Sequence, residues 1–292
     1  MKMRTRLIAC AASVALAAGA LAGCTNPGAS AAPGGEAGDV AALAGEVSAT
    51  AIGPDPTEAM LTRSRGPFAV GQRRGSGAGF AGGTVYYPTD QSLGRMGAVV
   101  VVPGFMSVEA QMAWWGPRLA SHGFVVMVIG TYTLADIPAS RASQQNAALR
   151  WLSTSSFVAN RIDPTRLAAA GWSMGGGGSL DAARSNPNIK VVVPMAPWNP
   201  GSIYLYSKPT FILSCQADLI ATNGINSDVF YGSLTGEKAQ LTIGGSHFCP
   251  TSPNTAAARY VVAWLKKFLD GDSRYNSFVC TPRLSYRNTC PV

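Results

Sequence analysis

Short apolar runs alternate with longer amphipathic stretches from residue 82 of this 292-residue chain onward. Two runs, AVVVV at 98–102 and FVVMVI at 124–129, are apolar at every position, as in parallel strands that helices cover on both faces. We expect strands at residues 83–87, 98–102, 124–129, 166–171, 190–195, 210–214 and 240–243, and helices at 109–121, 140–152, 174–184 and 256–269. This alternation predicts an α/β fold with a mostly parallel, doubly wound sheet flanked by helices.

The first 54 residues follow a different pattern. Three basic residues precede an uncharged apolar run at residues 7–21, which predicts a secretory signal over residues 1–23. The run ends in Leu-Ala-Gly-Cys, which resembles a bacterial lipobox. We therefore expect Cys24 to be lipidated and to be the only link to a membrane, whereas cleavage a few residues further on would release a free exported protein. Residues 24–54, rich in Ala, Gly and Pro and without aromatic residues, predict a flexible tether. Residues 55–292 then form one folded domain.

Composition narrows the class of partner. A hydrophobic fraction of 47% is enough for a sizeable core. The net charge of +8 is spread along the chain, since the only adjacent basic pairs beyond the signal are 73–74 and 266–267. Dispersed charge on an exported chain argues against a nucleic-acid partner and favours weak adhesion to anionic polymers.

The stretch AAAGWSMGGGGSLDAA at residues 168–183 contains Ser173 in a G-x-S-x-G motif. An apolar strand precedes it and a potential helix follows it, which is the context of a nucleophile elbow. Glycines beside the serine let the backbone and the neighbouring helix approach closely. A phosphate-binding loop is disfavoured, because no G-K-[ST] follows. The pattern predicts that Ser173 is a nucleophile.

A serine nucleophile needs a base, and the chain has only two histidines. His122 lies upstream of the serine, at the end of a predicted helix, and is expected to be structural. His247 follows a late strand, where this chain order puts the base.

The acid should follow a strand that lies between the serine and the base. Asp218 does so, whereas its rival Asp228 lies further into a polar loop and Asp181 lies on the helix after the serine. The order Ser173, Asp218, His247 is that of α/β-hydrolases.

Two backbone N–H groups are candidates for an oxyanion hole. The first belongs to Met174, which directly follows the serine. The second belongs to Phe105, in the loop after the strand at 98–102, because Pro103 has no N–H to donate.

Four cysteines remain beyond the signal and Cys24, and an even number in an exported chain favours two disulfides, with three possible pairings. They are Cys215, Cys249, Cys280 and Cys290.

Residues 60–290 resemble the bacterial cutinases and polyester hydrolases, which include the poly(ethylene terephthalate) hydrolases. The similarity rests on PGFMS, WWGPRLASHGFVV, GWSMGGGGSL, APWN, GGSHF and AWLKKFLDGDSRY, in that order along the chain. The resemblance implies a lidless α/β-hydrolase fold, no cofactor or metal, and hydrolysis of ester bonds in polyesters and short-chain esters.

The resemblance also assigns roles to residues. It places Ser173, Asp218 and His247 on the triad and Phe105 and Met174 on the oxyanion donors. It implies that substrate contacts come from Phe105, Trp172, Trp198, Ile220 and Phe248. It implies disulfides Cys215–Cys249, which would join the acid loop to the base loop, and Cys280–Cys290. The best-known member of the mesophilic poly(ethylene terephthalate) hydrolase branch has a small serine after the catalytic histidine, whereas this chain has Phe248, as in the heat-loving cutinases, and this bulky ring is expected to narrow the cleft.

The hypothesis is therefore an exported, monomeric serine ester hydrolase that acts on polyesters or small esters. A lipase or an acetyl-carbohydrate esterase could use the same triad. A surface lipoprotein that has lost activity, a Cys215 nucleophile and a metal site at His247 and Cys249 are weaker alternatives, since the triad is intact and both cysteines suit a crosslink.

Overall fold

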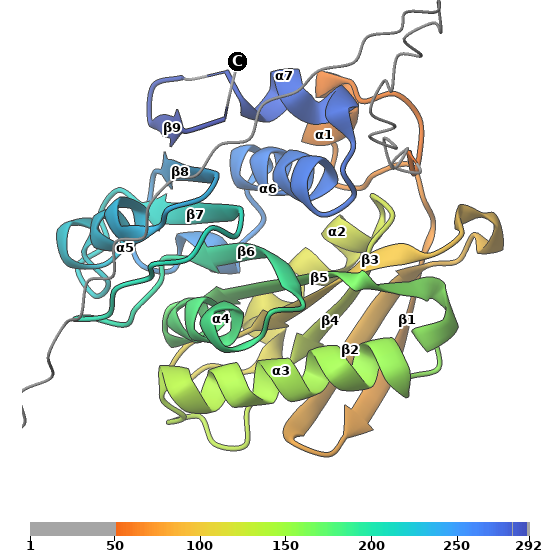
Figure 1. The fold of residues 1–292 in the computed structure, drawn as a ribbon, viewed down its shortest axis with the longest axis horizontal. Coiled ribbons are helices and arrows are strands. Elements are labelled where there is room, and N and C mark those ends of the chain that lie inside the picture. Colours follow the sequence, from red (N-terminus) through yellow and green to blue (C-terminus); the bar gives the residue numbers. More distant parts are fainter. Residues whose placement is uncertain (1–50, 282, 291–292) are drawn as a thin grey trace, which may run out of the picture. The chain divides into compact units, whose positions relative to one another are not determined.

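A single mixed sheet organises residues 51–281 and 283–290, which are the residues that the computed structural model describes. Its strand order is β1-β2-β4-β3-β5-β6-β7-β8-β9 (Figure 1). The strands are β1 (Val70–Gly77), β2 (Phe80–Pro88), β3 (Met96–Val102), β4 (Val125–Ile129), β5 (Ile162–Trp172), β6 (Ile189–Met195), β7 (Thr210–Cys215), β8 (Lys238–Ile243) and β9 (Tyr286–Asn288). The signal, Cys24 and most of the predicted tether lie outside the described residues.

The six central strands, β3 to β8, pair in parallel, and antiparallel strands close both edges. Every residue of β3 and β4 is buried, in agreement with runs that are apolar on both faces. The carboxyl ends of the parallel strands therefore meet at one edge of the sheet, where the loops that follow them can form a site.

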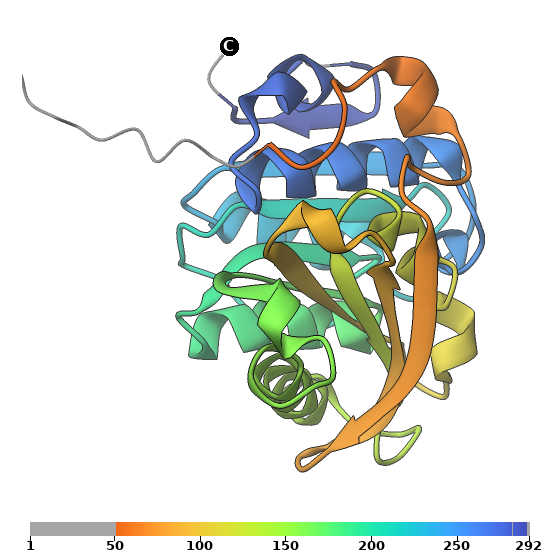
Figure 2. The same cartoon turned by 90° about the vertical axis from the view of Figure 1, so that its right-hand side faces the viewer.

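Helices cover both faces of the sheet. One apolar cluster joins α2 and α6 to one face, and a second joins α3, α4 and α5 to the other, as the two views show (Figures 1 and 2). The helices are α1 (Glu58–Thr62), α2 (Trp115–Ala120), α3 (Pro138–Thr154), α4 (Met174–Ser185), α5 (Ser227–Ser233), α6 (Thr255–Phe268) and α7 (Asn276–Val279). This is an α/β-hydrolase fold, as expected from the sequence.

The predicted elements agree with the structure except at a few places. The helix expected at 109–121 is split into a 3₁₀ turn at Glu109–Met112 and the short α2. Pro117 has no N–H and fits only the first turn of a helix, which is where α2 places it. The edge strand β1 was not predicted, because its sequence VGQRRGSG has no apolar alternation and its solvent-facing position requires none.

Of the two predicted cysteine pairs, one forms a disulfide in the structure and the other does not. Cys215 at the end of β7 and Cys249 form a disulfide with Cα atoms 6.0 Å apart, as predicted. The expected bond between Cys280 and Cys290 is absent: both are buried free thiols. Burial, and then a hydrogen bond between the two thiols, raises the pKa of Cys290 above its usual range. The fold thus brings the second pair close together, without a bond between the two sulfur atoms.

No helix among residues 51–281 and 283–290 is both long enough and apolar enough to cross a lipid bilayer.

Replacing His122 should change how stability depends on pH. The ring is buried, its two nitrogens have no hydrogen-bond partner among the described residues, and desolvation, with Arg118 and Lys266 nearby, lowers its pKa to about 3. Between pH 6.5 and 3 the unfolded chain therefore binds a proton that the folded chain does not, so stability falls as pH drops, by about 1.4 kcal/mol per pH unit. In His122→Leu this contribution disappears, and urea unfolding at pH 7, 6, 5 and 4 measures it. The parent and His122→Leu have the same carboxylates, so any difference between their pH dependences of unfolding free energy comes from His122. Equal dependences in the two chains would contradict the prediction.

Removing the crosslink should lower stability without changing the fold. The disulfide joins residues separated by 34 positions, and closing such a loop stabilises a folded chain by about 4 kcal/mol. The double variant Cys215→Ala/Cys249→Ala should lose about this much in denaturant unfolding. A reducing agent should produce a similar loss in the parent and none in the variant; an unchanged midpoint in both experiments would show that the crosslink contributes nothing.

Candidate active site

Ser173 lies in the turn between β5 and α4 with a strained backbone, φ 58° and ψ −124°. A non-glycine residue keeps this conformation only where its surroundings impose it. Its N–H donates to the Met195 carbonyl at 2.9 Å, and its own carbonyl accepts from the N–H groups of Trp198 and Gly177. Neighbouring β6 and the first turn of α4 thus hold the serine in place.

The glycines around Ser173 are required by close contact. A Cβ on Gly175 would lie 2.3 Å from the Val102 carbonyl oxygen of β3, and one on Gly171 would lie 2.3 Å from the Gly175 oxygen. Real Cβ atoms do not approach so closely, so any side chain would push α4 away from the sheet. The glycine run is therefore part of a packed helix and not a flexible linker.

Ser173, His247 and Asp218 form one hydrogen-bonded chain. The Ser173 Oγ lies 2.8 Å from His247 Nε2, and His247 Nδ1 lies 2.8 Å from Asp218 Oδ2. Each of the three residues is at most 6% exposed. Acid and base come from the loops after β7 and β8, so strand order alone brings together residues that are 29 and 74 positions apart.

Asp218 is held as a carboxylate. Its Oδ1 accepts hydrogen bonds from the N–H groups of Ile220 at 2.9 Å and Ala221 at 2.7 Å. Burial acts to raise the pKa of Asp218, but the hydrogen bonds from His247 and Ala221 outweigh it and hold the pKa below its ordinary value. The negative charge therefore persists at neutral pH and fixes which His247 nitrogen carries a proton.

The rival residues lie elsewhere. His122 is buried beside Arg118 and Lys266, without a partner for its ring nitrogens among the described residues. Asp228 pairs with Arg287 at 2.6 Å, and Asp181 pairs with Arg184 at 2.7 Å. None of them reaches Ser173.

Two backbone donors face the serine side of the sheet. Met174 is the first residue of α4, so its N–H has no partner within the helix. Phe105 follows Gly104, and a Cβ on Gly104 would lie 2.8 Å from the Ser173 Cβ, which places this loop directly against the serine. Neither the Phe105 nor the Met174 N–H donates to another described residue.

Arg141 holds the loop that carries Phe105, a role that sequence analysis missed. This residue of α3 is fully buried and donates to the carbonyls of Asp136 at 2.7 Å, Pro103 at 2.9 Å and Leu134 at 2.9 Å. Its neighbour along the helix, Gln145, donates to carbonyls of both β3 and β5. Nothing in the helical pattern distinguishes these polar residues from surface ones, so only their burial reveals them.

Trp172 does not line an open cleft as expected. It is 2% exposed and belongs to the apolar cluster between the sheet and α6. Its indole N–H donates to the His247 carbonyl at 2.8 Å, and its ring lies 5.3 Å from that of Phe248. As the last residue of a buried strand it points into the core, where it supports the loop after β8 that carries His247, which we call the base loop.

The other predicted contacts do lie at the surface. Phe105, Ile220 and Phe248 are each about half exposed, and Trp198 is partly exposed. Further exposed apolar side chains occur on the loops after β3, β4 and β7: Met106, Tyr132, Leu134 and Leu219. The loops that carry these side chains all follow parallel strands, so the exposed apolar residues gather at the edge of the sheet where Ser173 lies.

The base loop is anchored from three directions. The disulfide ties Cys249 to β7, the Trp172 indole holds the His247 carbonyl, and the carbonyl of Pro250 accepts hydrogen bonds from the indoles of both Trp114 and Trp115, at 2.9 and 3.0 Å. These anchors limit how far the imidazole can move from Ser173 and Asp218. Within the described part of the chain, no group of three or more His, Cys, Asp or Glu residues could hold a metal ion.

Comparison with known proteins places this geometry in a family. The sequence profile described as PETase, PET hydrolase-like, matches residues 44–291. A bis(hydroxyethyl) terephthalate hydrolase of Streptomyces coelicolor is 44% identical over 252 residues, which cover 82% of this chain and 81% of that protein. Cutinase est2 of Thermobifida alba is 45% identical over 256 residues, covering 82% and 85%. A cutinase of Thermobifida fusca is 44% identical over 256 residues, covering 82% and 84%.

The profile match includes all the described residues, and each of these relatives aligns with 82% of the chain. The chain belongs to the PET hydrolase-like family.

Proposed function

We propose that this carboxylic ester hydrolase cleaves ester bonds in polyesters and short-chain esters through an acyl-enzyme on Ser173. The observation that carries the proposal is the unbroken chain of hydrogen bonds from Ser173 through His247 to Asp218. Such a chain activates a weak nucleophile, because the base accepts the hydroxyl proton as the oxygen attacks.

Acylation begins when Ser173 Oγ attacks the ester carbonyl and His247 Nε2 takes its proton. Asp218 stabilises the imidazolium that forms, and its backbone hydrogen bonds keep it ionised. The N–H groups of Phe105 and Met174 donate to the oxyanion of the tetrahedral intermediate. His247 then returns the proton to the leaving alkoxide, the ester C–O bond breaks, and the acyl group stays on Ser173.

Deacylation repeats these steps with water. His247 takes a proton from the water as its oxygen attacks the acyl carbonyl, and returns it to Ser173 as the second tetrahedral intermediate collapses. A carboxylic acid leaves, which is ionised at neutral pH.

The surface around the serine favours an apolar ester. The half-exposed Phe105, Ile220 and Phe248, with Trp198 beside them, offer flat apolar contacts and no charge. Aromatic or aliphatic polyester chains suit such a surface better than acetylated sugars, whose hydroxyl groups would lose hydrogen bonds to water there. The names of the relatives, cutinases and a bis(hydroxyethyl) terephthalate hydrolase, support the same class. The Phe248 ring lies tilted against Trp172 and edge-on to the His247 ring, so its bulk occupies part of the surface beside the base.

The proposed function also includes export of the enzyme from the cell. The basic and apolar pattern of residues 1–23 supports it, and so does the disulfide between Cys215 and Cys249, since such bonds persist in oxidising compartments. Metabolic labelling with a clickable fatty acid distinguishes a chain anchored through Cys24, which would carry the label, from a freely released monomer, which would not.

Replacing the serine tests the chemistry. Ser173→Ala should reduce turnover of p-nitrophenyl butyrate and of polyester film by about 10³-fold or more, because no other group can form the acyl-enzyme. Unfolding by denaturant serves as the control for an intact fold, and Ser179→Ala, a serine of the same helix, should retain activity. Near-parental turnover in Ser173→Ala would refute the mechanism. Hydrolysis by the parent of acetylated sugars but not of polyester film would refute the substrate class.

A further inference from the structure

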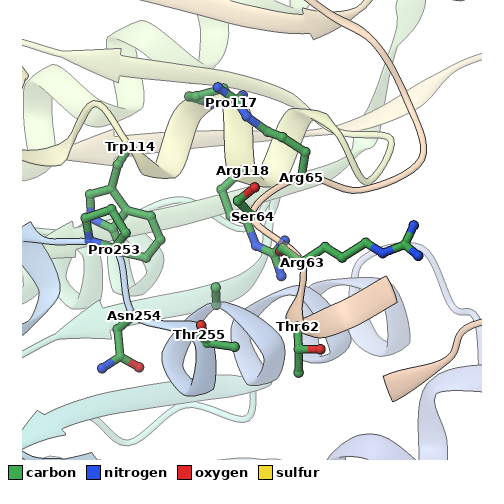
Figure 3. Close-up of a pocket in the computed structure, with 11 residues that line it drawn as sticks. Thr62, Arg63, Ser64, Arg65, Trp114, Pro117, Arg118, Pro253, Asn254 and Thr255 are labelled. Atoms are coloured by element: carbon green, nitrogen blue, oxygen red, sulfur yellow. The ribbon is translucent and has the colours of Figure 1, made fainter. Parts of the chain in front are cut away.

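A cavity that contains none of Ser173, His247 and Asp218 lies beside the start of α6. It occupies about 290 Å³ between the segment after α1, helix α2 and the beginning of α6 (Figure 3). A cavity of about 150 Å³ can hold a benzene molecule, so this one has room for an aromatic ring with a polar substituent. Its lining residues are Thr62, Arg63, Ser64, Arg65, Trp114, Pro117, Arg118, Pro253, Asn254, Thr255 and Ala258.

The cavity carries positive charge without a counterion. Arg63, Arg65 and Arg118 all line it, and none of the three forms an ion pair with a carboxylate among the described residues. Figure 3 shows the Arg118 guanidinium near the middle of the lining residues, whereas the side chain of Arg63 extends away from Trp114. The Arg65 side chain extends towards Pro117 (Figure 3), and its charge acts on Arg118, so these two cations influence the same part of the lining.

Arg118 is the unusual member of this group, because it is only 3% exposed. Two of its nitrogens donate to the carbonyls of Leu61 and Arg63, and its buried Nε has no partner in the described structure. Desolvation, and then the charge of Arg65, lowers the pKa of Arg118 to about 10. An anion that binds beside a buried cation stabilises it, because the anion supplies the missing opposite charge. The effect is larger where a second cation lies nearby.

The N-terminus of α6 adds to this field. Asn254 caps the 14-residue helix by accepting from the Ala257 N–H at 2.9 Å, while the N–H groups of Thr255 and Ala256 donate to no other described residue. Asn254 and Thr255 both line the cavity. Free N–H groups and the positive end of the helix dipole favour an anion at this position.

The opposite wall is apolar and flat. Trp114 lies there beside Pro253, and Pro117 lines the cavity further along, next to the Arg65 side chain (Figure 3). The indole of Trp114 is fixed, because its N–H donates to the Pro250 carbonyl at 2.9 Å and its ring packs on Trp115 with centroids 4.0 Å apart. A rigid aromatic face beside two guanidinium groups suits a planar ring that bears a carboxylate.

We propose that this cavity is a second, non-catalytic binding site for aromatic carboxylates, with Arg65, Arg118 and the α6 N-terminus receiving the carboxylate and Trp114 contacting the ring. The binding chemistry does not depend on the activity at Ser173; only the supply of ligand rests on the proposed function, since hydrolysis of an aromatic ester yields an aromatic acid. That ligand has two possible sources, the free acid and the carboxyl end of a polyester chain.

Calorimetric titration of the full chain with benzoate tests the site. We expect one benzoate per chain, binding more tightly than acetate because acetate lacks the ring. Arg65→Gln should weaken benzoate binding by roughly three- to fivefold, as fits the loss of one exposed charge contact. Arg95→Gln removes an exposed arginine elsewhere and should leave the affinity unchanged. Trp114→Leu should lower the affinity for benzoate to that for acetate, because the aromatic contact is lost.

Three results would overturn the proposal: no saturable benzoate binding, an affinity no higher than that of acetate, or equal losses in the Arg65 and Arg95 variants. Ester turnover by Arg65→Gln should equal that of the parent, so a failure of the second site and a failure of the esterase proposal give different results.

Adsorption separates the two sources of ligand. Polyester particles with free carboxyl ends should retain the parent better than Arg65→Gln if chain ends bind, and end-capped particles should retain both equally. Equal adsorption on both kinds of particle, together with weaker benzoate binding by Arg65→Gln, would identify the free acid as the ligand.

Discussion

The contact between α4 and the sheet is the constraint on which the site depends. The helix begins one residue after Ser173 and approaches β3 so closely that a single Cβ at Gly175 would meet a carbonyl oxygen at 2.3 Å. This approach forces Ser173 into a left-handed conformation, directs its hydroxyl out of the sheet and leaves the Met174 N–H free. The two groups to which we assign the roles of nucleophile and oxyanion donor are thus positioned by one packing requirement.

The other catalytic groups lie on loops, and the protein restricts those loops by crosslinking them. The disulfide joins the loop after β7 to the loop after β8, and three tryptophan indoles hold carbonyls of the base loop. Arg141 does the same for the loop of Phe105. Each of these hydrogen bonds ends on a backbone carbonyl, so it fixes the course of the chain and leaves the side chains of Ser173 and His247 free to exchange protons.

The segment from His247 to Ala258 serves two surfaces of opposite character. Its first residues border the apolar surface around Ser173, where Phe248 is exposed beside the triad. Its last residues, which cap and begin α6, border the cavity that Arg65 and Arg118 make positive. An aromatic ester suits the first surface and the acid formed from it suits the second, because hydrolysis converts a neutral group into a carboxylate.

The sequence by itself determined the alternation of strands and helices, the elbow at Ser173 and the choice of His247 and Asp218. These follow from local periodicity, from a short motif and from chain order, all of which can be read from the linear sequence. Only the tertiary structure decided that Trp172 is buried, that Arg141 and Gln145 are interior, that Cys280 and Cys290 are buried, and that Arg118 has no carboxylate partner among the described residues. Burial and charge pairing depend on which distant residues meet, and no pattern within a single segment encodes that.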